Sequence, residues 1–503
     1  MSVRVTRLDN GLRIVSDPMD SVESISLGAW VAVGARDEPA QLNGISHLLE
    51  HMAFKGTERR DAKRIAEEIE SVGGHLNAYT ARESTAYFAK ILKDDLDLAV
   101  DIIADILQHS MMDAVELGRE QDVIVQEIHQ SNDTPDDIIF DFFQETAFPG
   151  QAIGRPVLGT VDMVRAMDRD VLLNYMRGHY SAPNIVFAAA GRFEHDRLVA
   201  LVSAAFDALP APGNTGREAA SYQGGEFQES RQLEQAHVLI GLRGVAYADR
   251  DFYAATVLST LLGGGMSSRL FQEVREKRGL AYSIYSYMST YQDDGVFGIY
   301  AGTGEKEVAG LVPLVFEEIA KLTDGAPEEE IARARAQVKA GILMSLESTT
   351  ARCEQLARQM IVFDRPLSVD EIVAEVEAVD GAAIRRVAER LTASRPTIAG
   401  IGPAPGMKGL EQASRRFRAA PRRRGRRLRR GRRRRTTCAD RCRSSSSPIP
   451  TCCRGSVRTP GRCRRRRAAS RCRGFRNRAG PAPSRRSRAP TGFAWGRRRR
   501  RSP

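Results

Sequence analysis

The sequence is poor in cysteine over most of its length. Of the seven cysteines in 503 residues, only Cys353 falls among residues 1–414, which excludes a disulfide framework there. No stretch approaches eighteen consecutive apolar residues, so we expect no membrane-spanning helix. The first ten residues have neither the apolar core of a secretory signal nor an acid-free transit pattern. We therefore expect a cytoplasmic protein.

Residues 415–503 contain no lysine and one acidic residue, Asp440, beside 35 arginines. Subtracting them from the 75 basic and 63 acidic side chains of the whole chain leaves 40 and 62, a net charge of −22 for residues 1–414. The arginine runs would fit a nucleic-acid arm on charge alone, but aromatic side chains for base stacking are almost missing. Arginine without lysine favours GC-rich codons read out of frame, a frameshift product, over a genuine basic tail. Under either reading, we expect residues 411–503 to be disordered and nucleic acid not to be a partner.

What the sequence does contain is His47-Leu48-Leu49-Glu50-His51, within a predicted amphipathic helix at residues 44–57. His47 and His51 are four positions apart, so both imidazoles leave the same helical face. That spacing suits two zinc ligands, and Glu50 lies close enough to take a proton from water at the metal. The order His-x-x-Glu-His is the inverzincin signature. Two helix histidines beside a solvated glutamate would be the structural alternative.

A catalytic zinc needs three protein ligands and an open position, so a third ligand is expected. A second helix is predicted at residues 113–131, where Asp113 and Glu116 make a capping-box-like start. Glu120 and Glu127 are seven positions apart and share one face of that helix. Carboxylates that face a core are costly unless they bind a cation or pair with one another. An acidic solvated face fits the same pattern, and the residues alone leave both alternatives open.

Two further segments carry polar residues of possible chemical use. Residues 271–286 predict a short charged helix, ended by Gly279 and followed by a strand. Arg275 and Tyr282 in that segment are, by themselves, typical of a solvated helix charge and a half-buried strand aromatic. Residues 75–80 follow a Gly-Gly pair and predict a strand of alternating character.

Together these segments resemble the pitrilysin family of zinc metallopeptidases, and more closely its bacterial and mitochondrial processing-peptidase branch. The resemblance covers the chain from its N-terminus to about residue 410. It rests on the His-x-x-Glu-His motif, on the position of Glu127 76 residues after His51, and on three shorter runs. These runs are Leu8-Asp9-Asn10-Gly11-Leu12, Gly73 to Thr80, and Ser267-Ser268-Arg269-Leu270-Phe271.

The resemblance implies that one Zn²⁺ per chain is held by His47, His51 and Glu127, and that Glu120 supports the site. It also implies that Arg275 and Tyr282 approach the zinc from a second domain, where cationic and O–H donors suit a developing oxyanion.

The resemblance further implies that residues 75–80 form an edge strand beside the zinc. Such a strand pairs with extended substrate by β-augmentation. The candidate substrate-binding residues in it are Asn77, Ala78 and Tyr79.

Residues 1–414 are long enough for two domains with full hydrophobic cores. A Pro- and Gly-containing segment near residues 207–230 marks a linker, and the flanking halves repeat one order of elements. Strands at 25–33 and 236–244 correspond, as do helices at 96–107 and 306–322. The corresponding helix of the second copy, near residues 258–265, has no His-x-x-Glu-His, so the metal belongs to the first copy.

We therefore predict an α+β fold of two similar, duplicated α/β sandwich-like domains that enclose a cavity. Each has a mixed, largely antiparallel sheet with helices packed on it. Residues 1–208 would form the N-terminal zinc-binding domain, 209–230 the linker and 231–410 a C-terminal domain without metal.

The sequence thus predicts a zinc-dependent endopeptidase in which Glu50 activates zinc-bound water. A net charge of −22 on residues 1–414 favours basic, unfolded peptides by electrostatic steering. The resemblance implies a homodimer or a heterodimer with a related subunit. The alternative is a non-catalytic structural or partner subunit of the same family, which loss of a ligand or of the glutamate would mark. This sequence keeps all four residues.

Overall fold

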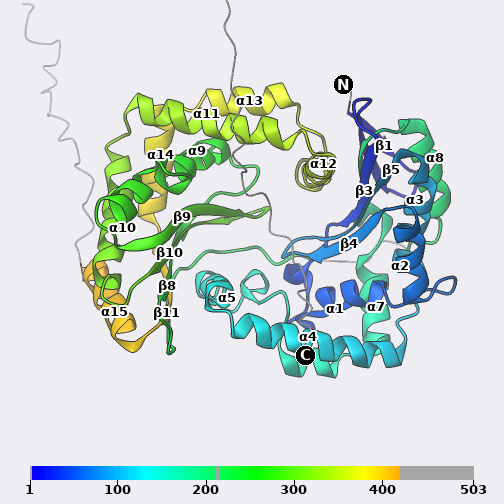
Figure 1. Cartoon of the computed structure of the whole chain (residues 1–503), viewed down its shortest axis with the longest axis horizontal. Coiled ribbons are helices and arrows are strands. Elements are labelled where there is room, and N and C mark those ends of the chain that lie inside the picture. The colour runs from blue at the N-terminus through cyan, green and yellow to red at the C-terminus, as the bar shows by residue number, and fades with distance from the viewer. Residues whose placement is uncertain (1–2, 211–215, 420–503) are drawn as a thin grey trace, which may run out of the picture. The chain divides into compact units, whose positions relative to one another are not determined.

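Two β-sheets with helices packed on them make up the part of the chain that the computed structural model describes, residues 3–210 and 216–419 (Figure 1). These residues lie within one compact unit, Met1–Arg423. We call residues 3–210 the first half and residues 216–419 the second half. The expectation about residues 420–503 lies outside the described residues. No helix in the described ranges is both long enough and apolar enough to cross a bilayer.

The two sheets have the same strand order, apart from one extra edge strand in the first. The first sheet runs β1-β2-β6-β3-β5-β4 and the second β7-β11-β8-β10-β9. In each sheet one pair is parallel, β2 with β6 and β7 with β11, and the other pairs are antiparallel. The predicted duplication of a mixed, largely antiparallel sheet is therefore confirmed. The strands are β1 Arg4–Arg7, β2 Arg13–Pro18, β3 Ser24–Val31, β4 His75–Thr80, β5 Thr85–Leu92, β6 Ile185–Gly191, β7 Glu226–Ser230, β8 Ala236–Arg243, β9 Ala281–Thr290, β10 Gly295–Thr303 and β11 Thr397–Gly402.

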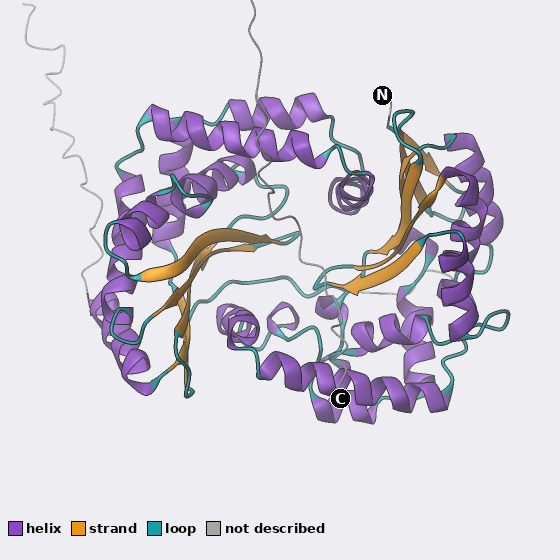
Figure 2. Cartoon of the chain, viewed as in Figure 1, coloured by secondary structure: helices purple, strands orange, loops and turns teal. Residues whose placement is uncertain are grey.

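Each half packs its own helices on one face of its sheet (Figure 2). In the first half these are α1 Ile45–Ala53, α2 Ala62–Ser71, α3 Leu96–Gln108, α4 Ala114–Asn132, α6 Val161–Ala166, α7 Arg169–His179 and α8 His195–Ala205. In the second half they are α9 Phe252–Gly263, α10 Val308–Thr323, α11 Glu328–Ser345, α13 Val369–Glu377, α14 Gly381–Ala393 and α15 Ala404–Ala419. Short 3₁₀ turns occupy Ala35–Asp37, Ala40–Leu42, Lys93–Asp95, Ala152–Gly154 and Ala182–Asn184.

The opposite face of each sheet is covered by a helix from the other half. Helix α5, Pro135–Ala147, belongs to the first half by sequence but packs on β8 and β11 of the second sheet. Phe143 lies so close to the second sheet that a side chain at Gly241 would overlap its ring, 2.2 Å from Cζ. Helix α12, Thr349–Phe363, belongs to the second half but packs on β2, β3 and β6. The halves therefore exchange one helix each.

Three elements differ from the sequence expectation. The predicted linker 209–230 ends in strand β7, which pairs with β11 in parallel. The predicted disordered tail begins within helix α15, which spans Ala404–Ala419 and whose Met407 and Leu410 are buried against the second core. The short charged helix before β9 is a single π-helical segment, Phe271–Glu276.

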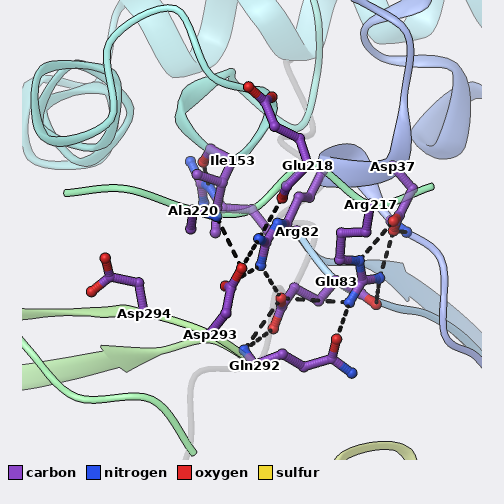
Figure 3. Close-up of polar contacts among 12 residues, drawn as sticks. Asp37, Arg82, Glu83, Ile153, Arg217, Glu218, Ala220, Gln292, Asp293 and Asp294 are labelled. Atoms are coloured by element: carbon purple, nitrogen blue, oxygen red, sulfur yellow. Dashed lines mark hydrogen bonds and ion pairs between the residues drawn. The ribbon is translucent and has the colours of Figure 1, made fainter.

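Five paired charged side chains join the two halves through the linker, and we call them the polar seam (Figure 3): Arg36, which is buried, Asp37, Glu83 and Arg217, which are partly buried, and Asp293, which is exposed. The Arg36 side chain is fully buried and donates to both carboxylate oxygens of Asp293, at 2.8 and 2.6 Å. Arg36 also donates to Glu83 at 2.6 Å, and Arg217 holds Asp37 with two hydrogen bonds of 2.7 Å. Paired and hydrogen-bonded charges are the form in which buried ions persist, so the seam fixes the linker between the halves.

Candidate active site

Helix α1 carries the His-x-x-Glu-His motif and is fixed by its apolar face. Leu48, Leu49 and Met52 are fully buried in the core of the first half, which leaves the opposite face for His47 and His51. The helix starts at Gly44, whose φ of 97° favours glycine, and a side chain there would also meet the carbonyl of Leu158.

The free N–H groups at the start of α1 are capped by the carboxylate of Glu38, six residues before Gly44 in the sequence. Glu38, 3 % exposed, accepts hydrogen bonds from the backbone N–H groups of Gly44 and Ser46 at 2.8 Å, and from the Asn43 amide at 2.9 Å. This satisfies orphan donors of the first turn. Burial raises the pKa of the Glu38 carboxyl to about 7, although these hydrogen bonds favour its charged form.

Helix α4 brings Glu127 over α1. Asp113 caps α4 by accepting from the N–H groups of Val115 and Glu116, as expected. The Glu116 side chain pairs with Arg119, so the reciprocal contact of a capping box is not seen among the described bonds. Leu117, Ile124 and Ile128 bury the core-facing side of α4.

The ligand atoms of His47, His51 and Glu127, which we call the metal cluster, lie within 4.8 Å of one another. The Nε2 atoms of His47 and His51 are each 3.7 Å from Glu127 Oε2. Donors around a four-coordinate zinc at about 2.0–2.2 Å are roughly 3.3–3.5 Å apart, so the three residues need only small shifts to hold one ion.

The orientation of His51 is set by Glu120. Glu120 is 6 % exposed, and its Oε2 lies 3.0 Å from His51 Nδ1 while its Oε1 lies 2.6 Å from Lys55 Nζ. A carboxylate facing Lys55 accepts, so Nδ1–H of His51 donates and the lone pair of Nε2 points toward Glu127. The two glutamates predicted on one face of α4 are therefore both beside α1, in different positions.

The chemistry of the donor set fits a cation. Burial, with a smaller contribution from His51, lowers the pKa of His47 to about 3, so its imidazole is neutral. Its buried Nδ1 has no partner among the described residues. Two imidazole nitrogens and one carboxylate oxygen then face one another, and a divalent ion satisfies all three.

Glu50 lies on the same helix as the two histidines and contacts strand β4. Its Oε2 accepts a 2.6 Å hydrogen bond from Thr80 Oγ1. Burial raises the pKa of the Glu50 carboxyl, and the nearby Glu127 adds to this effect, whereas Thr80 and His51 oppose it. A carboxylate with a raised pKa is a better proton acceptor near neutral pH.

Strand β4 is the edge of the first sheet, as expected for residues 75–80. Ala78 packs toward the core of the first half. Its backbone N–H donates a 2.8 Å hydrogen bond to the side-chain oxygen of Asn77. Tyr79 points to the α12 face, where its hydroxyl accepts from Trp30 Nε1 at 3.2 Å. None of the three touches the metal cluster among the described contacts.

Arg275 and Tyr282 lie together in the second half. The guanidinium carbon of Arg275 is 4.6 Å from the centre of the Tyr282 ring and 4.8 Å from that of Phe271, so the cation stacks between two aromatics. Tyr282 is 74 % exposed. Among the described contacts, none joins this pair to the metal cluster or to Glu50.

Sequence reasoning missed two residues that position the site. Thr80 holds Glu50, and Lys55 holds Glu120. Lys55 is four residues after His51, and Thr80 is two residues after Ala78 on the same strand face, so both signals were present. Their targets became visible only when α1, α4 and β4 were in place.

Comparison with known proteins gives the family. Residues 13–161 match the insulinase family of peptidases, M16, and residues 166–338 match the M16 inactive domain. An uncharacterized zinc protease of Streptomyces coelicolor is 41% identical over 412 residues, covering 80% of this chain and 90% of that protein. An uncharacterized zinc protease of Bacillus subtilis is 36% identical over 400 residues, covering 79% and 98%.

Two solved structures have the same fold. One is a protease from Helicobacter pylori, with a TM-score of 0.74 and 22% identity, covering 80% of this chain and 99% of that one. The other is an M16 inactive domain from Pseudomonas fluorescens, with a TM-score of 0.75 and 20% identity, covering 80% and 98%. With two matched domains and relatives that align over most of their length, the chain belongs to the insulinase family of peptidases, M16.

Proposed function

We propose that this protein is a zinc-dependent endopeptidase with one Zn²⁺ per chain, held by His47, His51 and Glu127. The observation that carries the proposal is the convergence of three donor atoms within 4.8 Å, with Glu50 on the same helix. Zinc, when bound, supplies Lewis acidity, which polarises a carbonyl and lowers the pKa of water from 15.7 toward about 7.

In this proposal the chain's own residues move the proton and fix the geometry. Glu50 accepts a proton from the attacking water and later delivers it to the leaving amine. Thr80 restricts the Glu50 carboxylate by its 2.6 Å hydrogen bond. Glu120 keeps His51 in the tautomer that leaves Nε2 free. These contacts hold the base and the ligands in place before substrate arrives.

The substrate backbone is proposed to lie along β4, next to Asn77, Ala78 and Tyr79, because an edge strand offers unpaired backbone groups to an extended peptide. Arg275 and Tyr282 are proposed to donate to the substrate oxyanion from the second half. Their mutual stacking keeps both donors at one place, and the exposure of Tyr282 leaves its hydroxyl free for substrate.

The charge of the chain supports basic, unfolded peptides as substrates. Residues 1–414 carry a net charge of −22, which attracts cationic ligands over a Debye length. The single cysteine of that region supports a reducing compartment such as the cytoplasm. A homodimer, or a heterodimer with a related subunit, is the assembly proposed by family resemblance.

The test combines metal content with cleavage. Elemental analysis of the purified full chain should give one zinc per chain, and a quenched basic peptide should be cleaved. Removal of zinc with a chelator should stop cleavage, and adding zinc back should restore it. A protein that binds zinc but cleaves no peptide would favour the non-catalytic subunit instead, and a protein that binds no zinc would contradict the metal assignment.

A further inference from the structure

A cavity of about 240 Å³ lies between strand β4, helix α12 and the hairpin that joins β9 to β10. Its walls are mainly aromatic and aliphatic: Trp30, Tyr79, Tyr247, Tyr291, Ile361 and Val362. A cavity of roughly 150 Å³ is enough for a benzene ring in a well-studied engineered case, another protein. The space therefore admits a bulky apolar side chain.

The shape of the cavity follows from the pairing of three strands. Tyr79 on β4 is opposite Ala86 on β5, and Ala86 is opposite Trp30 on β3, so the three form one row across the sheet. Ala86 has only a methyl group, and the Trp30 indole reaches over it to the Tyr79 hydroxyl at 3.2 Å. The row presents a flat aromatic surface toward α12, because side chains in one row share a face.

The charged side chains that line the cavity have their charges matched. Arg82 donates to Asp141 at 2.9 Å, Glu83 accepts from Arg36 in the polar seam, and Arg358 donates to Glu354 at 2.8 Å. Figure 3 shows Glu83 beside Gln292, whose backbone N–H donates to the Glu83 carboxylate, whereas Arg82 extends toward Ile153. The wall is thus held rigidly and offers no unmatched charge to a ligand, which favours an apolar occupant over a charged one.

The cavity and the proposed catalytic base contact neighbouring residues of strand β4. Tyr79 lines it, and the next residue of β4, Thr80, contacts Glu50. Because β4 is an edge strand, a peptide residue paired opposite Tyr79 would extend the row of Tyr79, Ala86 and Trp30 on the same face. Its side chain would then point toward the cavity.

We propose that this cavity binds a bulky apolar side chain, aromatic above all, of an extended peptide that lies along β4. The inference rests on the proposed peptidase function and adds a substrate preference to it. The basic residues of a substrate would serve attraction to the acidic chain, and the apolar residue would fix the register on β4.

The test uses the full zinc-loaded chain and a set of basic peptides with alanine at every variable position. In each peptide one alanine is replaced by phenylalanine. Phenylalanine should raise kcat/KM by about 10-fold or more at one position, the effect of burying one aromatic side chain. Val362→Trp fills the cavity and should bring this ratio close to one. Val115→Trp, at a 63 % exposed position on α4, is the matched control and should keep the ratio.

Two further measurements keep the test decisive. If Val362→Trp does not fold, Tyr247→Ala enlarges the cavity and should move the preference from phenylalanine to tryptophan. The chain has two tryptophans, Trp30 and Trp495, so Trp30 emission can be followed in a Trp495→Phe, Glu50→Gln protein without cleavage. Phenylalanine peptides should shift this emission, and the all-alanine peptide should not.

The outcomes separate the two proposals. Peptides that shift Trp30 emission but are never cleaved by the parent protein would contradict the peptidase and leave the cavity assignment standing. Cleavage with no preferred phenylalanine position, and no change in Trp30 emission, would overturn the cavity assignment and leave the peptidase standing.

Discussion

The two halves of the molecule have the same strand order but different chemistry on the helix that follows the first long strand. In the first half, α1 follows β3 and carries His47, Glu50 and His51, which are partly buried. In the second half, α9 follows β8 and is almost entirely apolar, with Val257, Leu258 and Leu262 fully buried. The fold therefore does not require the metal residues. The difference indicates that the site is a property of a few side chains in one copy.

The N-termini of these two helices also differ, in the partners of a buried carboxylate. At α1 the buried carboxylate of Glu38 has N–H partners, and burial raises its pKa to about 7. At α9 the buried carboxylate of Asp251 is held by Arg386 and Arg390, at 2.6 to 2.8 Å. Burial alone would raise the pKa of Asp251, but these two arginines outweigh it and the pKa is lowered. The carboxylate at the start of α1 is thus stabilised by N–H donors without a cation, whereas the carboxylate at the start of α9 is paired with two arginines.

Separating the halves is expected to have the largest effect. Residues 1–210 and 216–419, expressed apart, should each be inactive and should bind a hydrophobic dye. Each half would lack the helix from the other half, α12 or α5, that covers one apolar face of its sheet. Co-expression should restore a complex by size-exclusion chromatography and some cleavage. An active, monomeric first half would show that the second half is not needed for the chemistry.

Glu50→Gln should lower turnover by on the order of 10²–10⁴, the usual contribution of general acid–base catalysis. Zinc content should stay at the parent level because Glu50 is not a proposed ligand. The matched control is Glu318→Gln, which changes a buried carboxylate of the second half, 3 % exposed. It should leave turnover unchanged. A metal-loaded Glu50→Gln protein with full activity would contradict the proposed base.

Arg275→Ala and Tyr282→Phe should lower kcat/KM by roughly 10²–10³, the cost of losing one oxyanion donor in a well-studied protease. Neither change should alter zinc content, since no described contact joins the pair to the metal cluster. Arg278→Ala, which removes an exposed partner of Glu273, is the control. Equal effects of Arg275→Ala and Arg278→Ala would point to general electrostatics instead of a specific donor.

Glu127→Gln and Glu120→Gln should separate a ligand from the residue that orients one. Glu120→Gln should weaken zinc binding by roughly 10–100-fold, as is typical for groups that hold a ligand in place. Glu127→Gln should weaken it more, because a direct donor is lost. Competition with a chelator measures both. The reverse order of the two effects would mean that their roles are exchanged.

The smallest effect concerns stability against pH. Glu38 has a raised pKa in the folded protein, so its contribution to stability is greatest below pH 4.5 and falls by on the order of 2–3 kcal/mol as the pH rises to about 7. Asp251 has a lowered pKa, so its contribution is present above its unfolded pKa and is lost in acid. Urea unfolding from pH 3 to 8 should show that Glu38→Gln removes the first slope and Asp251→Asn the second. Identical pH profiles for the parent and Glu38→Gln would contradict the raised pKa.

The sequence predicted best what is local. The spacing of His47 and His51 follows from helix geometry, and the bounds of β3, β8, α3 and α4 follow from apolar periodicity and from the Asp113 cap. The distance between Glu127 and α1 could not be obtained in this way. It needed family resemblance, because a solvated acidic face gives the same pattern.

What the sequence could not predict depends on contacts between distant residues. The apolar residues of α5 and α12 look like those of any amphipathic helix, and nothing in their periodicity tells which sheet they cover. Strand β7 is short and lies in a segment with many turn residues, so only its pairing with β11 defines it. The aromatic cavity is formed by residues from Trp30 to Val362 and has no local signature.

The exchange of α5 and α12 also sets the order in which the chain can complete its fold during synthesis. The apolar side of α5, with Ile139, Phe143 and Ala147, is made before any strand that covers it. The last of these strands, β11, ends at Gly402, about 255 residues after α5 ends at Ala147. At 5–20 residues per second this is a delay of roughly 10–50 s. During that time the first half exposes two apolar surfaces on the ribosome, so its yield should depend on chaperones and on translation rate more than its final stability suggests.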